Sequence, residues 1–246
     1  AVSDAAVDLG YSAGRFKDLH LSGTAFLSLI ETATSGTSNF RAGVNAGNSI
    51  ASGGNYNTVV GDEAGTAIST GDNNTFLGYQ SGDAVNTGGD NVAIGFSALS
   101  AEDAHGLNVA VGSQALRVQN AGANGYNVGV GYNAGGAITS GIQNVLVGGL
   151  AGNSLTDADY NVAVGMGALD ADTLGSRNTA IGYAALTDQN FTTATNSYNV
   201  GVGFYAGTDI TTGVQNTLIG GLAGDALTDA DFNVAMGYAA LGADTL

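Results

Sequence analysis

The chain has 246 residues, of which 41 are glycine, and it contains neither cysteine nor proline. Five Lys and Arg residues against 21 Asp and Glu residues give a formal charge of −16. The lack of cysteine excludes a disulfide framework and a thiolate metal site. The acidic balance argues against a protein that binds the phosphates of nucleic acids. No run of 18 apolar residues occurs, so we expect no membrane insertion.

Residues 1–38 differ in composition from the rest of the chain and hold its only lysine, Lys17. The pair Leu19 and Leu21 and the apolar run at residues 26–30 predict two short strands. Because the ends of a stacked repeat need a distinct covering, we interpret residues 1–38 as a lead-in and cap region. The chain begins without methionine and ends inside a repeat, so we expect it to be a piece of a longer protein.

Residues 39–246 are built from about twelve copies of one unit. The unit reads Asn, a β-branched residue, any residue, an aliphatic residue and Gly, and it recurs mostly every 17 residues. Its asparagines are Asn57, Asn74, Asn91, Asn108, Asn127, Asn144, Asn161, Asn178, Asn199, Asn216 and Asn233, after a degenerate first copy at Asn39. Its glycines are Gly61, Gly78, Gly95, Gly112, Gly131, Gly148, Gly165, Gly182, Gly203, Gly220 and Gly237. Such a period predicts an all-β parallel solenoid of 17-residue coils.

A longer period lies over the coils. The eighth residue after each asparagine is Gly in two successive coils, as at Gly65, and then Leu in two, as at Leu99. We call these glycine coils and leucine coils. Residues 126–174 and 198–246 align without a gap and share most of their residues, which indicates duplication of a four-coil block.

Each coil is expected to contain a strand of about five residues, a glycine corner, a second short strand and a polar loop. The stacked asparagines predict a ladder of side-chain amides, and the repeated glycines predict tight corners. Strand side chains alternate between faces. We expect the β-branched and aliphatic residues to face the interior, and the middle residue to face outward. Since the middle residue is never polar, we expect a second chain to cover it, with Phe76, Leu146 and Leu218 in inter-chain packing.

Two segments resemble known families. Residues 91–99, Asn-Val-Ala-Ile-Gly-Phe-Ser-Ala-Leu, resemble the repeat of YadA-like heads in trimeric autotransporter adhesins, which are homotrimeric parallel β-rolls with coils of about fourteen residues. Residues 8–23 are similar to a segment of phage tail-fibre proteins that often precedes such repeats. Both resemblances imply a homotrimeric surface fibre, and the second favours a phage.

Few residues offer catalytic or metal-binding chemistry. His20 and His105 have no recognisable partner at the spacing of a metal site or a catalytic triad, so we expect no function for either. Paired acids recur in the loops, namely Asp157 with Asp159, Asp170 with Asp172, and Asp229 with Asp231. They are typical of turns, in which Asp bonds to the backbone. A calcium site or a glycosidase pair is the functional alternative.

Other patterns also have structural interpretations. The glycine-rich strings at residues 129–131 and 147–149 lack the Lys-Ser/Thr of a phosphate loop. Tyr132 and Tyr183 are expected to stack between coils, with sugar contact as the alternative. Threonines occur singly rather than in the flat array of an ice-binding solenoid.

We therefore expect a non-enzymatic structural segment of a phage tail fibre, without cofactor or metal, that spaces and presents a receptor-binding tip. Its expected partners are itself, as a homotrimer, and neighbouring fibre or tail proteins. The alternative is the head of a bacterial surface adhesin that binds host matrix or glycan. These hypotheses place the chain on a virion surface or on a cell surface. A polysaccharide-degrading β-helix enzyme has little support, because no cluster of acids stands out.

Overall fold

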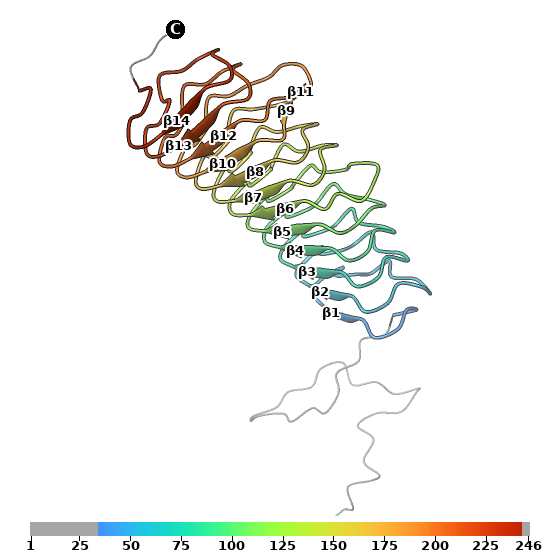
Figure 1. The fold of residues 1–246 in the computed structure, drawn as a ribbon. Helices are drawn as coiled ribbons and strands as arrows, with labels where there is room; N and C mark the ends of the chain where they lie inside the picture. The colour runs from blue at the N-terminus through green and yellow to red at the C-terminus, as the bar shows by residue number, and fades with distance from the viewer. Residues whose placement is uncertain (1–33, 243–246) are drawn as a thin grey trace, which may run out of the picture. The chain divides into compact units, whose positions relative to one another are not determined.

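A computed structural model describes residues 34–242, which form a parallel β-solenoid. Twelve short strands pair in chain order into one sheet, with no helix among the described residues (Figure 1). They are β1 (Phe40–Ala42), β2 (Thr58–Val60), β3 (Thr75–Leu77), β4 (Val92–Ile94), β5 (Val109–Val111), β6 (Val128–Val130), β7 (Val145–Val147), β8 (Val162–Val164), β10 (Thr179–Ile181), β12 (Val200–Val202), β13 (Thr217–Ile219) and β14 (Val234–Met236). The strands expected within residues 1–33 lie outside the described residues.

Every pairing in this sheet is parallel and joins equivalent residues of successive coils, as Val92 joins Val109. The insertions in the longer coils therefore leave the register intact, for example between Thr179 and Val200. Two further strands, β9 (Gly175–Ser176) and β11 (Thr195–Asn196), pair in the loops. The predicted 17-residue parallel solenoid of about twelve coils is confirmed for the described residues.

The predicted strand lengths and second strands are wrong. Each main strand has three residues rather than five, and a turn follows the corner glycine in every coil. These turns contain residues with positive φ, such as Gln80 at 54° and Gly82 at 56°, a conformation that an extended strand cannot adopt. A coil therefore consists of one strand, a tight turn and a polar loop.

The assignment of the two strand faces is also wrong. The middle residue of every strand from β2 to β13 is fully buried inside the coil, whereas its two neighbours face outward and are at least partly exposed. Phe76, Leu146 and Leu218 are completely buried within this single chain and do not form inter-chain packing. The interior of each coil is filled by the middle strand residue together with residues of the turn, as Leu146 is with Ala151 and Leu155, so their sizes must fit one another.

Glycine coils and leucine coils fill the same interior in two ways. The eighth residue has a left-handed backbone in both, with φ of 60° at Gly135 and 47° at Leu116. In leucine coils this leucine fills the interior beside an alanine from the strand, as Leu99 does with Ala93. In glycine coils an aliphatic residue from the turn contributes instead, and most of these coils also have a larger strand residue, as Leu155 and Leu146 show. In β6 and β12 the strand residue is glycine, and the leucine of the preceding coil lies against it, as Leu116 does against Gly129.

The coil types also differ at the eleventh residue after the asparagine. In glycine coils this residue is aliphatic, as at Ile138. In leucine coils it is polar and still completely buried, at Glu102, Gln119, Asp172 and Gln189. Because a buried polar group is costly unless it has partners, these four positions stand out where the glycine coils have aliphatic residues.

Candidate functional site

The largest unusual surface is the outer face of the twelve-stranded sheet. It consists of the two outward residues of each strand, which are valine, isoleucine, leucine, methionine or threonine in β2 to β14. Their exposure ranges from partial to large, with Leu77 at 47%, Val145 at 37% and Met236 at 73%. We call this surface the outer sheet face. It carries no charged residue between β2 and β14.

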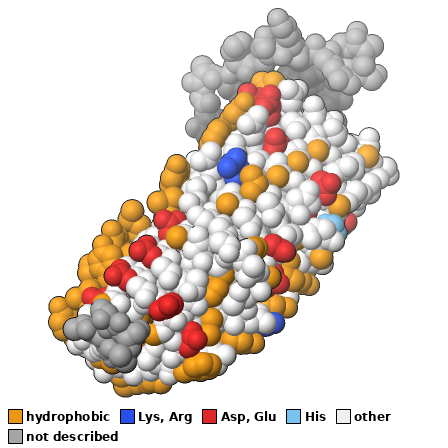
Figure 2. All heavy atoms as spheres, turned by 90° about the horizontal axis from the view of Figure 1, so that it is seen from above, with side chains coloured by type: hydrophobic (Ala, Val, Ile, Leu, Met, Phe, Trp, Pro, Cys, Tyr) orange, Lys and Arg blue, Asp and Glu red, His pale blue; other side chains and the backbone are white. Residues whose placement is uncertain are grey.

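Aromatic side chains border the outer sheet face. The residue after the corner glycine is an exposed aromatic in several coils, and successive ones stack, with ring centroids 5.9 Å apart for Tyr79 and Phe96 and 5.5 Å apart for Tyr183 and Phe204. Tyr132 is exposed at the equivalent position. In the space-filling view, hydrophobic side chains line one edge of the visible surface, and acidic side chains are dispersed among uncharged ones (Figure 2).

A second exposed row precedes the asparagines. There the guanidinium of Arg177 lies 4.7 Å from the ring centroid of Tyr160 and 5.9 Å from that of Tyr198. Both tyrosines are exposed, so the three side chains form a small cation–π stack across neighbouring coils.

The repeated asparagines form a continuous ladder through the interior. From Asn39 to Asn233, the side-chain Oδ1 of each asparagine accepts a hydrogen bond from the backbone N–H of the next, at 2.8–3.1 Å. Most Nδ2 groups donate to a loop carbonyl, such as Asn144 to Ala158 at 2.8 Å. Each asparagine side chain thus bonds to the backbone at the start of the next strand and to the backbone of a loop, so the ladder fixes the position of both.

The corner glycines meet the next coil at close range. Gly148 has φ of 139°, and a Cβ atom on it would lie 2.4 Å from the carbonyl oxygen of Gly165. Positive φ recurs at all eleven predicted corner glycines. Among the glycine-rich strings, Gly129 is the buried middle residue of β6, and no helix follows it in the described part of the chain, as a phosphate loop would need.

Three of the six paired loop acids, Asp159, Asp172 and Asp231, accept hydrogen bonds from backbone N–H groups. Asp159 accepts a hydrogen bond from the Ile142 N–H at 2.8 Å, and Asp231 accepts one from the Val214 N–H at 2.7 Å. Asp157 accepts one from the hydroxyl of Ser140. These contacts link each acid to the equivalent loop of the neighbouring coil, 17 residues away, rather than to the backbone of its own turn.

Asp172 is a buried acid with a full set of donors. Its Oδ1 accepts bonds from the N–H groups of Gly175 at 3.0 Å and Phe191 at 3.1 Å, and its Oδ2 accepts one from the Gln189 side chain at 2.6 Å. Burial nevertheless raises the pKa of the Asp172 carboxyl above its usual range, against the opposing effect of these bonds.

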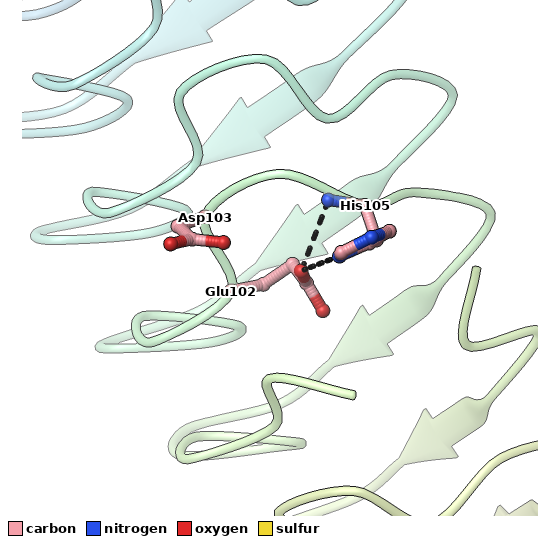
Figure 3. A group of neighbouring side chains, drawn as sticks. All are labelled: Glu102, Asp103 and His105. Atoms are coloured by element: carbon pink, nitrogen blue, oxygen red, sulfur yellow. Dashed lines mark hydrogen bonds and ion pairs between the residues drawn. The ribbon is translucent and has the colours of Figure 1, made fainter. Parts of the chain in front are cut away.

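Glu102, Asp103 and His105 bring three potential metal-binding atoms together in the loop of a leucine coil (Figure 3). One ligand atom from each residue lies within 4.8 Å of the other two. Glu102 is completely buried, and its Oε1 lies 3.7 Å from His105 Nδ1. Burial raises the pKa of the Glu102 carboxyl, and a hydrogen bond from the His105 N–H opposes this effect.

Sequence reasoning missed this cluster because it sought partners for His105 at recognised motif spacings. His105 nevertheless has an acidic neighbour, Glu102, three residues before it in the same loop. The available signal was the pair of acids immediately upstream. His20 lies outside the described residues.

Comparisons of the chain with protein-family models, curated proteins and solved structures give no match. Within residues 34–242, there is no helix of the length and apolar character needed to cross a lipid bilayer.

Proposed function

We propose that this chain is a non-enzymatic structural segment of a homotrimeric phage tail fibre that spaces and presents a receptor-binding tip. The observation that carries the proposal is the uncharged, largely apolar outer sheet face on a strongly acidic chain. Twelve strands at about 4.8 Å spacing and two outward residues per strand give a strip on the order of 500–800 Å². A strip of this size equals or exceeds the largest apolar patch of a typical monomer and approaches the area each partner buries in a standard interface.

A second and third copy of the same chain suit this surface. The outer sheet face repeats the same two columns of side chains at every coil, so identical chains aligned in register present valine, isoleucine and threonine to one another along the whole length. A chain charge of −16 disfavours adventitious contact elsewhere on the surface, because like charges repel. Three copies, rather than two, follow from the resemblance of the repeat to YadA-like heads.

The proposed mechanism is mechanical. The asparagine ladder and the parallel backbone pairing tie every coil to its neighbours, so bending the stack requires breaking many hydrogen bonds together. The phage setting, the neighbouring fibre or tail proteins and the virion-surface location rest on the resemblance of residues 8–23.

The oligomer is tested by light scattering at low micromolar concentration. We expect a mass of three chains for the native protein and a lower mass for Val145→Glu/Val162→Glu, which places carboxylates in the outer sheet face. Asn120→Glu/Ala123→Glu adds the same two charges in an exposed loop and should leave three chains. A monomeric native protein, or a double variant that remains trimeric, contradicts the proposal.

The exposed, stacked aromatics support a second candidate, the adhesin head that itself binds glycan. Aromatic rings on a surface suit the apolar faces of sugars, and Tyr183 with Phe204 forms such a platform. Glycan-array binding that is lost in Tyr183→Ala/Phe204→Ala while the trimer persists supports this candidate. If no glycan on the array binds, the result favours the first proposal, in which the segment only spaces the fibre.

A further inference from the structure

The loop at residues 102–105 contains buried polar atoms without partners. Glu102 Oε2 and His105 Nδ1 are both buried and have no hydrogen-bond partner. The side chain of Gln119, the equivalent residue of the next coil, is completely buried, and both of its polar atoms also lack partners. Unpartnered buried polar atoms are costly, and a bound ion is one of the explanations for them.

The equivalent loop of the next four-coil block shows what the fold itself requires. Seventy residues along the chain, Asp172 stands at the position of Glu102, Gly175 at that of His105 and Gln189 at that of Gln119. The Gly175 N–H bonds to Asp172, as the His105 N–H bonds to Glu102.

The two blocks differ in how the amide and the imidazole are used. Gln189 donates to Asp172 at 2.6 Å, and its Oε1 accepts a bond from Asn199 at 2.8 Å, so that pair has its partners. The imidazole of His105 has no counterpart on Gly175, and the carboxylate of Asp103 has none on Thr173. The equivalent loop of the next block therefore adopts this conformation without an imidazole or a second carboxylate, so the side chains of His105 and Asp103 are not needed for the fold.

We infer that Glu102, Asp103 and His105 bind a divalent transition-metal ion of the Zn²⁺ class through two carboxylates and the imidazole Nδ1. Zn²⁺ accepts nitrogen and oxygen ligands at about 2.0–2.2 Å, so tetrahedral ligands stand roughly 3.3–3.6 Å apart. Glu102 Oε1 and His105 Nδ1 are 3.7 Å apart, too long for a hydrogen bond but close to that separation. An imidazole with two carboxylates favours Zn²⁺ over Ca²⁺, which prefers six to eight oxygens.

The backbone holds these residues in place from both sides. The Asp103 carbonyl accepts bonds from the N–H groups of Asn86 and Thr87 at 2.6 and 3.1 Å, and the His105 carbonyl accepts one from the Asn91 side chain at 3.3 Å. Figure 3 shows the side chains of Glu102 and His105 turned toward each other, with Asp103 on the other side of Glu102. The Asp103 side chain is exposed, so it can swing toward an ion without disturbing the interior.

The test is calorimetric titration of the full 246-residue chain with ZnCl₂. We expect one ion per chain, and binding at least about 10–100-fold weaker in His105→Ala, because loss of a residue that only supports a ligand already costs that much. His20→Ala removes the chain's other histidine and should bind as the native chain does. No saturable binding, or equal weakening in both histidine variants, overturns the proposal.

Two further measurements guard against a folding defect. Asp103→Asn keeps the backbone hydrogen bonds and changes only an exposed side chain, so the variant should fold normally. Its affinity for Zn²⁺ should nevertheless be at least about tenfold lower than that of the native chain. In ¹H–¹⁵N spectra of the imidazoles, Zn²⁺ should shift the signals of His105 and leave those of His20 in place. Unchanged affinity in Asp103→Asn, or unchanged His105 signals at saturation, contradicts the assignment.

Discussion

A single amide side chain joins neighbouring coils in three directions. The Oδ1 of Asn144 accepts the backbone N–H of Asn161, and its Nδ2 donates to Ala158 in the loop and to Oδ1 of Asn127. Neither Asp, which cannot donate when ionised, nor Ser, which is too short to reach both sides, offers this combination. The recurrence of asparagine therefore has a chemical cause, and it could be predicted from sequence because the spacing is regular.

The corner glycines provide a paired test at residue level. Gly148→Ala places a Cβ 2.4 Å from the Gly165 carbonyl oxygen at φ of 139°, whereas Gly149→Ala meets nothing within 4 Å. We expect the first change to lower the free energy of unfolding by about 3–5 kcal/mol and the second by less than about 1 kcal/mol. Urea denaturation followed by circular dichroism measures both, and equal effects would show that corner geometry is not the cause.

At the scale of the coil, two packing solutions share one backbone. A leucine in a left-handed conformation costs about 1–2 kcal/mol, and burial of its side chain returns about 1.5–3 kcal/mol. Glycine avoids the first cost, and the space is then filled by a larger strand residue, such as Leu146 beside Gly152, or by the leucine of the preceding coil, such as Leu116 beside Gly135. The alternation of coil types thus redistributes side-chain volume within a coil and between neighbouring coils.

This redistribution predicts coupling between the middle strand residue and the eighth residue of a coil. A Cβ on Gly152 would lie 2.7 Å from Leu146 Cδ2, so Gly152→Leu alone should clash. Leu146→Ala alone should cost about 2–5 kcal/mol through the cavity that it leaves. The double variant reproduces the Leu–Ala pair of a leucine coil and should be more stable than the sum of the single effects predicts. Strict additivity in thermal unfolding would refute this account.

The number, order and register of the coils followed from the sequence, because the period is visible in the residues themselves. The orientation of the strand faces did not. Alternation separates two faces but does not say which is inside, and the β-branched residues were wrongly placed in the interior. The deciding signal was size: Gly129 is small where a Cβ would lie 2.8 Å from Leu116 Cγ. Such compensation between neighbouring coils marks an interior.

The candidate sites were less accessible to sequence reasoning than the fold. The outer sheet face emerged only once the strand orientation was known. The cluster of Glu102, Asp103 and His105 depends on a turn that brings a buried carboxylate beside an imidazole, and a short loop without periodicity gives no sign of burial.

At the scale of the whole molecule, partly or fully buried carboxyl groups are expected to make the folded state more stable at mildly acidic pH than at neutral pH. Burial raises the pKa values of the Asp83, Asp170 and Asp172 carboxyls. Between the ordinary and the raised pKa the folded state holds more protons than the unfolded chain, so stability falls as pH rises through that window. Loss of negative charge toward the pI of about 4.1 acts in the same direction.

We therefore expect the melting temperature to increase as the pH is lowered from 7 toward the pI of about 4.1, contrary to ordinary acid denaturation. The increase should be smaller in Asp172→Asn, which removes one of the titrating groups, although that variant is less stable overall. Differential scanning calorimetry across this range measures both slopes. A melting temperature that falls steadily as the pH is lowered over this range would contradict the expectation.

Strict register between equivalent residues has a further consequence for length. Each coil adds one strand spacing of about 4.8 Å whatever the size of its loop, so a four-coil block adds roughly 19 Å. Gain or loss of a whole block changes reach in fixed increments and leaves every remaining contact between coils as it was. The length of the solenoid is therefore set by the number of coils, and duplication or loss of a four-coil block changes it by a fixed increment.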